Sequence, residues 1–242
     1  MKAMGNLRFL ELACLLLTLF GVCGLQKVDA APSAPVKSGE SGEDRERRVL
    51  NYLWPVLKSA HKVGRIYYGD ACPQDDQFPR AFPQVDVRPA LRDEMGLAAV
   101  RSIFSKKNDV EVDEDSPGII RVRIGRVPDV ILRTRISILK LTPDAQFNYQ
   151  FAIDTIEKAP EVRAAMDELH VRVPVRYSHF LLAQPADELP HLPSEISGVT
   201  MDQALDMVAR TWSGIVLFGS CTRLRTYEIT FARGVYFHDS TN

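Results

Sequence analysis

The sequence predicts an α+β fold in which helices pack on antiparallel β-hairpins. Three patterns carry this prediction. Residues 46–60 place apolar side chains every three or four positions, which is typical of an amphipathic helix. Residues 110–124 alternate apolar and charged side chains on both sides of a Pro-Gly turn, which is typical of a hairpin. Residues 200–231 show the pattern of a helix followed by two strands.

The composition is that of an ordinary globular protein. The chain has 242 residues, of which 45% are hydrophobic, and it balances 30 Lys and Arg against 31 Asp and Glu. The apolar content excludes a disordered chain, which could not bury enough surface to offset its ordering entropy. The near-zero charge argues against a nucleic-acid partner, because phosphate binding needs clustered and uncompensated positive side chains.

Residues 1–30 are expected to be a signal peptide. Lys2 and Arg8 precede an apolar run over residues 10–25, and Val28-Asp29-Ala30 offers small residues at the positions that a signal peptidase reads. Cleavage near Ala30 would make the protein secreted or periplasmic. An uncleaved anchor is the alternative, although the run is shorter than the roughly 20 residues that span a bilayer. No later run is long and apolar enough to span one.

Residues 31–45 are small, polar and rich in Pro and Gly, which predicts a flexible leader. An N-terminal α+β part follows at residues 46–143. Its expected elements are a helix at 46–60, strands at 66–68 and near 84–88, a helix at 91–106 and the hairpin at 110–124. In the hairpin, Glu111 and Asp113 would face Arg121 and Arg123 on the exposed side, because opposite charges pair favourably across antiparallel strands.

Residues 144–242 form the C-terminal α+β part, which the sequence does not separate from the first part as a domain. Its expected elements are a helix at 144–158, a helix starting at Pro160, strands at 171–177 and 194–198, a helix at 200–212, and strands at 215–218 and 227–231. Thr200 and Gln203 have the spacing of a capping box. Both parts contain the order helix, strand, turn, strand, preceded by a short strand. This shared order raises the hypothesis of two related β-α-β-β units.

Loss of the signal peptide would leave two of the four cysteines, Cys72 and Cys221. An even pair in an oxidising compartment indicates one disulfide. Two separate buried thiols are the alternative, since free cysteine is among the most buried residue types. A catalytic thiol is the weakest reading, because neither cysteine has a nearby histidine.

Five arginines gather within 15 residues of the sequence, and the only acid among them is Asp129. A salt-bridged sheet edge and a surface for an anionic partner both fit this pattern. They are Arg121, Arg123, Arg126, Arg133 and Arg135.

The sequence contains no local signature of a catalytic, metal or cofactor site. Its five histidines are more than five residues apart, and the spacings typical of zinc ligands are missing. A phosphate-binding loop, a dinucleotide fingerprint and a nucleophile elbow are missing as well. We therefore expect neither a metal ion nor a cofactor.

Residues 194–232 carry a family resemblance. Ser197-Gly198-Val199-Thr200-Met201-Asp202-Gln203-Ala204-Leu205-Asp206, followed by Val208-Ala209 and a strand, resembles the small β-α-β-β module at the periplasmic start of secretins and TonB-dependent transporters. The resemblance covers about 40 residues and does not include a barrel. It implies a small protein-protein interaction module in the cell envelope.

These observations predict an exported, non-catalytic binding or assembly protein of the cell envelope that acts through protein-protein contacts. An exposed sheet edge could accept a partner strand. The alternative is a small secreted hydrolase whose site is assembled from residues distant in sequence, such as His170 or His179 with Asp187 or Glu188. A deep pocket lined by these groups would favour the enzyme, whereas a shallow surface beside a bare strand edge would favour the binding protein.

Overall fold

The computed structural model describes residues 41–69, 72, 82–90, 94–104, 109–173 and 189–234. All of them belong to one compact unit with an α+β fold, as the sequence predicts. None of the described helices combines the length and the apolar character needed to cross a lipid bilayer. The expected signal peptide and most of the expected leader lie outside the described residues.

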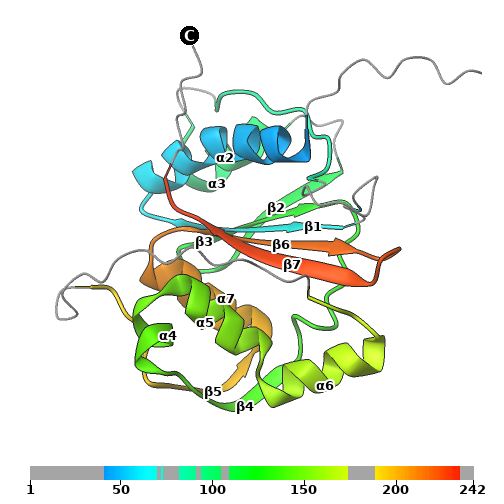
Figure 1. Cartoon of the computed structure of the whole chain (residues 1–242). Coiled ribbons are helices and arrows are strands. Elements are labelled where there is room, and N and C mark those ends of the chain that lie inside the picture. Colours follow the sequence, from blue (N-terminus) through cyan, green and yellow to red (C-terminus); the bar gives the residue numbers. More distant parts are fainter. Residues whose placement is uncertain are drawn as a thin grey trace, which may run out of the picture. The chain divides into compact units, whose positions relative to one another are not determined.

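A five-stranded mixed sheet forms the centre of the molecule (Figure 1). Its strands are β1 (Val63–Tyr68), β2 (Val110–Ser116), β3 (Ile119–Ile124), β6 (Ile215–Cys221) and β7 (Thr226–Ala232), in the spatial order β2-β3-β1-β6-β7. β1 runs parallel to both of its neighbours, whereas the edge strands β2 and β7 pair antiparallel. The parts of the chain before and after residue 143 therefore share one sheet.

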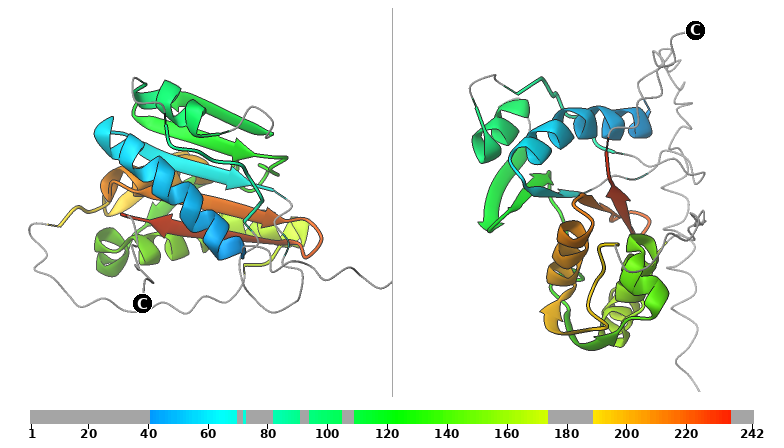
Figure 2. Two further views of the ribbon diagram at one scale, coloured as in Figure 1. Left: turned by 90° about the horizontal axis from the view of Figure 1, so that it is seen from above. Right: turned by 90° about the vertical axis from the view of Figure 1, so that its left-hand side faces the viewer.

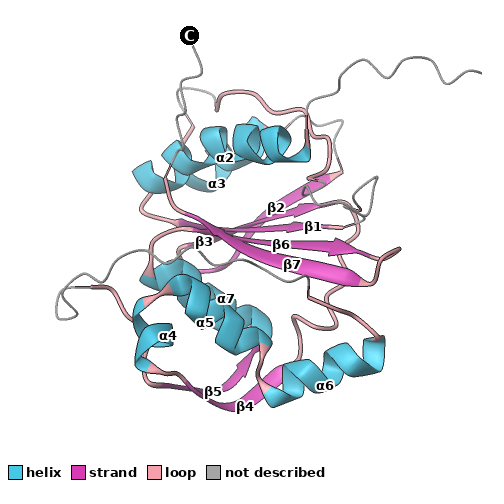
Figure 3. Ribbon diagram, viewed as in Figure 1, coloured by secondary structure: helices cyan, strands magenta, loops and turns pink. Residues whose placement is uncertain are grey.

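Helices cover both faces of this sheet (Figure 3). The face that we call the α2 face packs against α2 (Gly42–Ser59) and α3 (Gly96–Ile103). The opposite face, the α7 face, packs against α5 (Tyr149–Glu157), α6 (Pro160–Leu169) and α7 (Met201–Thr211). On this side α4 (Pro143–Phe147) and a two-stranded sheet of β4 (Arg135–Lys140) and β5 (Glu195–Thr200) complete the fold. The right-hand view of Figure 2 shows the same order of layers.

Strand alternation divides the side chains of the central sheet between two cores. In β1, Ile66 and Tyr68 join the core under α2, while Tyr67 joins the core under α7. Arg65 lies on the same side of the strand as Tyr67 and is completely buried. The α7 face thus contains a charged side chain that must find partners within the protein.

Local capping explains where two helices differ from the sequence prediction. α2 begins at Gly42, inside the expected leader, because the Ser41 hydroxyl accepts a hydrogen bond of 3.1 Å from the Asp44 N–H. The helix expected at 144–158 is split into α4 and α5 at Asn148. The Asn148 side chain accepts hydrogen bonds from the first turn of α5, at 2.8 Å from Gln150 N. The capping box of α7 is confirmed.

The hairpin expected at residues 110–124 is confirmed as β2 and β3. Glu111 lies opposite Arg123, and Asp113 lies opposite Arg121, as the charge pattern predicts. The expectation that both arginines lie on the exposed side is wrong for Arg121, which is only 4% exposed. β3 is second from the sheet edge, and the Arg121 side chain contacts Asp206 of α7.

The two segments with the order helix, strand, turn, strand do not occupy equivalent places. α3 packs on the α2 face, whereas α7 packs on the opposite face. The second strand of the first segment, β3, borders β1, but in the other segment the first strand, β6, does so. A shared element order therefore does not produce a repeated arrangement here.

Candidate functional site

Two groups of polar residues on the α7 face are candidates for function. The first, which we call the arginine–aspartate cluster, joins β1 and β3 to α7 through Arg65, Tyr67, Arg121, Asp202 and Asp206. One Arg65 nitrogen donates hydrogen bonds to the Asp206 carboxylate at 2.6 Å and to the Asp202 backbone carbonyl at 2.9 Å. The other terminal nitrogen donates to the Asp202 carboxylate at 2.8 Å.

The second arginine of this cluster lies beside the first. Arg121 is the register partner of Arg65 across the parallel strands, and it donates to the Asp206 carboxylate and, at 3.1 Å, to the Tyr67 hydroxyl. That hydroxyl donates in turn to Asp202 at 2.9 Å. Asp202 and Asp206 are four residues apart on α7, so both carboxylates face the same two strands.

The cluster is internally balanced. Two buried guanidinium groups face two carboxylates, and Arg121 also pairs with Asp115 near the surface. Burial raises the pKa of Tyr67 to about 12, so its hydroxyl stays protonated as a donor to Asp202. Because its charges are already paired, the cluster is suited to fixing α7 on the sheet and not to binding a ligand.

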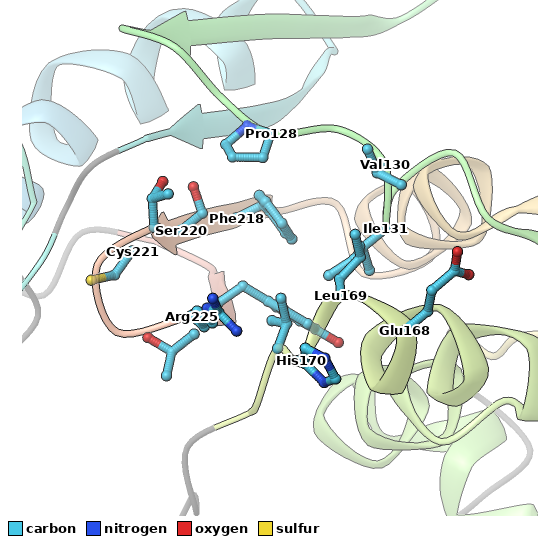
Figure 4. A pocket seen from close by; sticks show the side chains of 14 residues that line it. Pro128, Val130, Ile131, Glu168, Leu169, His170, Phe218, Ser220, Cys221 and Arg225 are labelled. Carbon is cyan, nitrogen blue, oxygen red and sulfur yellow. The ribbon is translucent and has the colours of Figure 1, made fainter. Parts of the chain in front are cut away.

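The second candidate is a cavity of about 430 Å³ at the turn between β6 and β7, which we call the turn cavity (Figure 4). Its size lies within the range of small-ligand pockets. Its lining is mostly apolar and consists of Pro128, Val130, Ile131, Glu168, Leu169, His170, Val171, Phe218, Ser220, Cys221, Thr222, Arg225, Thr226 and Tyr227.

Strands β6 and β7 form the floor of the turn cavity. Phe218 and Tyr227 belong to the core of the α7 face, and Ser220 lies on the same side of β6 as Phe218, two residues further along the strand. Ser220 is only 7% exposed, and its hydroxyl has no hydrogen-bond partner in the described part of the chain. The floor therefore presents a buried polar group that the protein does not satisfy.

The end of α6 forms one wall. His170 adopts a left-handed conformation with φ of 53° and ends the helix. The chain then runs beside the edge of β7, where Arg172 N donates to Arg225 O at 2.8 Å and Tyr227 N donates to Arg172 O at 3.3 Å. These two bonds hold the wall against the floor.

The turn after β6 carries Arg225 to the opposite end. The Leu224 N–H lies 3.2 Å from the Cys221 sulfur, and the Arg225 N–H donates to Thr222 O at 3.3 Å. Arg225 itself has a φ of 50° and is exposed. Its guanidinium forms no ion pair with any described residue, so a positive charge at the mouth of the cavity is free to meet a ligand.

The disulfide expected between Cys72 and Cys221 is present, with a Cα–Cα distance of 4.8 Å. Cys221 ends β6, and Cys72 follows the end of the neighbouring parallel strand β1. The bridge therefore ties the turn that carries Arg225 to the middle of the sheet.

The five clustered arginines do not share one environment. Arg121 is buried in the arginine–aspartate cluster, Arg123 pairs with Asp113, and Arg133 pairs with Asp129. The other two, Arg126 and Arg135, are exposed. Three of the five arginines therefore form salt bridges, which is the first of the two arrangements that the sequence predicts for them.

Of the residues named for a hydrolase site, His170 lines the turn cavity. His179, Asp187 and Glu188 lie outside the described residues. Within the described ranges, no three His, Cys, Asp or Glu side chains come together as metal ligands.

No sequence motif points to Arg65, Ser220 or Arg225. A weak signal for Arg65 existed, since a charged residue in a short apolar strand next to Ile66 requires a buried partner. Ser220 and Arg225 gave no such signal, because the cavity exists only where α6, the loop after β3 and the β6–β7 turn meet. No family model, no curated protein and no solved structure matches the chain.

Proposed function

We propose that this protein is an exported, non-catalytic binding protein of the cell envelope, and that it contacts a partner protein at the turn cavity. The observation that carries the proposal is the rim of the cavity. Val130 is 58% exposed and Leu169 is 39% exposed, and both line the cavity. Exposed apolar side chains around a preformed hollow are typical of a surface that buries an anchor residue of a partner.

Three further features support this proposal. The residues that resemble the envelope interaction module, 194–232, include β6, β7 and their turn, which make the cavity floor. The disulfide fits an oxidising compartment. The arginine–aspartate cluster, which holds the most strongly buried charges, is already paired and leaves the cavity as the open site.

The test is partner capture by the immobilised protein from the envelope fraction of its source cells. Val130→Asp places a charge on the rim, and Ile138→Asp is the matched control, because Ile138 is equally exposed at 57% but lies on β4 away from the cavity. We expect one stoichiometric partner to be retained by the wild type and by Ile138→Asp, and to be reduced at least tenfold with Val130→Asp. Equal capture by both variants, or no stoichiometric partner, would contradict the proposal.

A second candidate function is the secreted hydrolase, which one observation favours. His170 and Ser220 line the same cavity, as a base and a nucleophile would. No hydrogen bond joins the two side chains, since the Ser220 hydroxyl has no partner among the described residues, and they lie at separate sides of the cavity in Figure 4. Turnover of a p-nitrophenyl ester that disappears in both His170→Ala and Ser220→Ala would favour the enzyme over the binding protein.

A further inference from the structure

The turn cavity is chemically asymmetric. Its body is apolar, and its two charged extremities lie apart: Figure 4 shows Arg225 beside the β6–β7 turn and Glu168 at the α6 side. Neither side chain forms an ion pair with a described residue. A ligand that fills this cavity therefore meets a positive charge at the turn and a negative charge at the helix.

The buried Ser220 hydroxyl comes from the end of β6, the strand that leads into the turn of Arg225. Ser220 is one residue from Cys221, and the turn that begins there carries Arg225. A buried hydroxyl without a hydrogen-bond partner is unfavourable, so an acceptor oxygen brought by a ligand would be stabilised at this place. A guanidinium and an unsatisfied hydroxyl in the lining of one cavity are donors of the kind that suits a carboxylate.

The fold orders the backbone of the turn before any ligand arrives. The left-handed Arg225 donates its backbone N–H to Thr222 O, and the turn is tied to the sheet through the Cys72–Cys221 bridge. A pre-ordered turn loses little backbone freedom on binding, which favours affinity.

We propose that the turn cavity binds the carboxyl-terminal residue of the partner protein. The apolar side chain of that residue fills the hollow between Phe218 and Leu169, and its carboxylate bonds to Arg225 and the Ser220 hydroxyl. A terminal residue carries both groups on one Cα, which matches a cavity with an apolar body and a positive end. This inference rests on the proposed function and names the chemistry of its contact.

Peptide binding to the purified protein tests the inference by isothermal titration calorimetry. The probes are acetyl-Ala-Ala-Ala-Phe with a free carboxyl group, the same peptide as its carboxamide, and 4-phenylbutyrate as an acid without a peptide backbone. We expect the free acid to bind at least tenfold more tightly than the carboxamide, because a charge-assisted hydrogen bond is lost in the amide. Equal binding of acid and carboxamide would overturn the assignment of the carboxylate.

4-Phenylbutyrate distinguishes a peptide carboxyl terminus from a small apolar acid as the ligand of the turn cavity. Binding of the small acid as tightly as the peptide would show that the cavity takes a small apolar acid and would overturn the carboxyl-terminus proposal. Weaker binding of the small acid, by about tenfold, supports it.

Variants locate the binding. We expect Arg225→Gln to weaken the free-acid peptide at least tenfold and Arg225→Lys to restore part of the loss. Arg163→Gln is the control, because Arg163 is an exposed arginine of α6 that does not line the cavity. Ser220→Ala should weaken the peptide severalfold without lowering the thermal midpoint, since it removes an unsatisfied hydroxyl. An unchanged affinity in Arg225→Gln would contradict the inference.

The two proposals fail in different ways. If Val130→Asp loses partner capture and Arg225→Gln does not, the proposal that the partner contacts the turn cavity holds. The proposal that Arg225 binds the partner's terminal carboxylate is then wrong. Retention of the partner by both variants, together with no peptide binding, would overturn both.

Discussion

The arginine–aspartate cluster and the turn cavity lie on the same face of one sheet, yet they differ in how far their polar groups find partners within the protein. In the cluster, the completely buried Arg65 has three hydrogen bonds to α7, and the neighbouring Arg121 pairs with Asp206 and Asp115. In the cavity, the Ser220 hydroxyl has no hydrogen-bond partner among the described residues, and the exposed Arg225 forms no ion pair with any of them. The cluster pairs its charges within the protein, although Arg65 Nε has no hydrogen-bond partner, whereas the Ser220 hydroxyl has no partner at all among the described residues and can accept one from outside.

The comparison predicts that the largest loss of stability comes from the cluster. Asp206→Ala removes the carboxylate between Arg65 and Arg121, which leaves Asp202 as the carboxylate partner of the buried Arg65 and Asp115 as that of Arg121. We expect the free energy of unfolding to fall by about 3–5 kcal/mol, measured by urea denaturation. Asp113→Ala removes the partner of the half-exposed Arg123 and should cost less than about 1 kcal/mol. Similar losses in the two variants would show that burial does not distinguish the pairs.

The disulfide connects the two regions, since it ties the turn of the cavity to the sheet. Replacing both Cys72 and Cys221 by Ser should lower the free energy of unfolding by about 2–4 kcal/mol, because the unfolded chain gains the freedom of a long loop. The same variant should bind the free-acid peptide more weakly, because the turn that carries Arg225 loses its anchor. Unchanged stability under non-reducing conditions would speak against the bridge.

The pH dependence of stability isolates Tyr67 within the cluster. Burial raises the pKa of Tyr67 to about 12 in the folded protein, above the ordinary tyrosine value of about 10. A raised pKa means that the folded state holds the proton more tightly, so this contribution is complete below pH 10 and is lost as the pH rises towards 12. Urea denaturation of the wild type between these pH values should show the decline. Tyr67→Phe should show a smaller decline and, at neutral pH, a cost of about 1 kcal/mol for the lost hydroxyl bonds.

The smallest effect on stability is expected at the cavity rim. Val130→Asp changes an exposed side chain, so its free energy of unfolding should lie within about 0.5 kcal/mol of the wild-type value. Its thermal midpoint should match that of Ile138→Asp. A large loss of stability in Val130→Asp would mean that the rim is a packing element. The contrast between the two regions would then disappear.

Much of the fold could be predicted from local patterns. The hairpin of β2 and β3 and the capping box of α7 each depend on residues close in sequence, such as Thr200 with Gln203, and both are confirmed. The parallel placement of β1 between β3 and β6 could not be read in this way, because its partners are more than 50 residues away along the chain. Strand pairing over such separations depends on which apolar faces meet in the core.

Local sequence patterns suffice for the α+β class, for the positions of most elements and for the even pair of cysteines that the structure joins. These features follow from periodicity, capping residues and residue counts, which are local or compositional. Three features emerge only from the packed fold: the burial of Arg121, the two aspartates bonded to Arg65, and the cavity that Ser220 and Arg225 both line. The physical reason is that burial and the lack of a hydrogen-bond partner are properties of a packed arrangement and not of a residue.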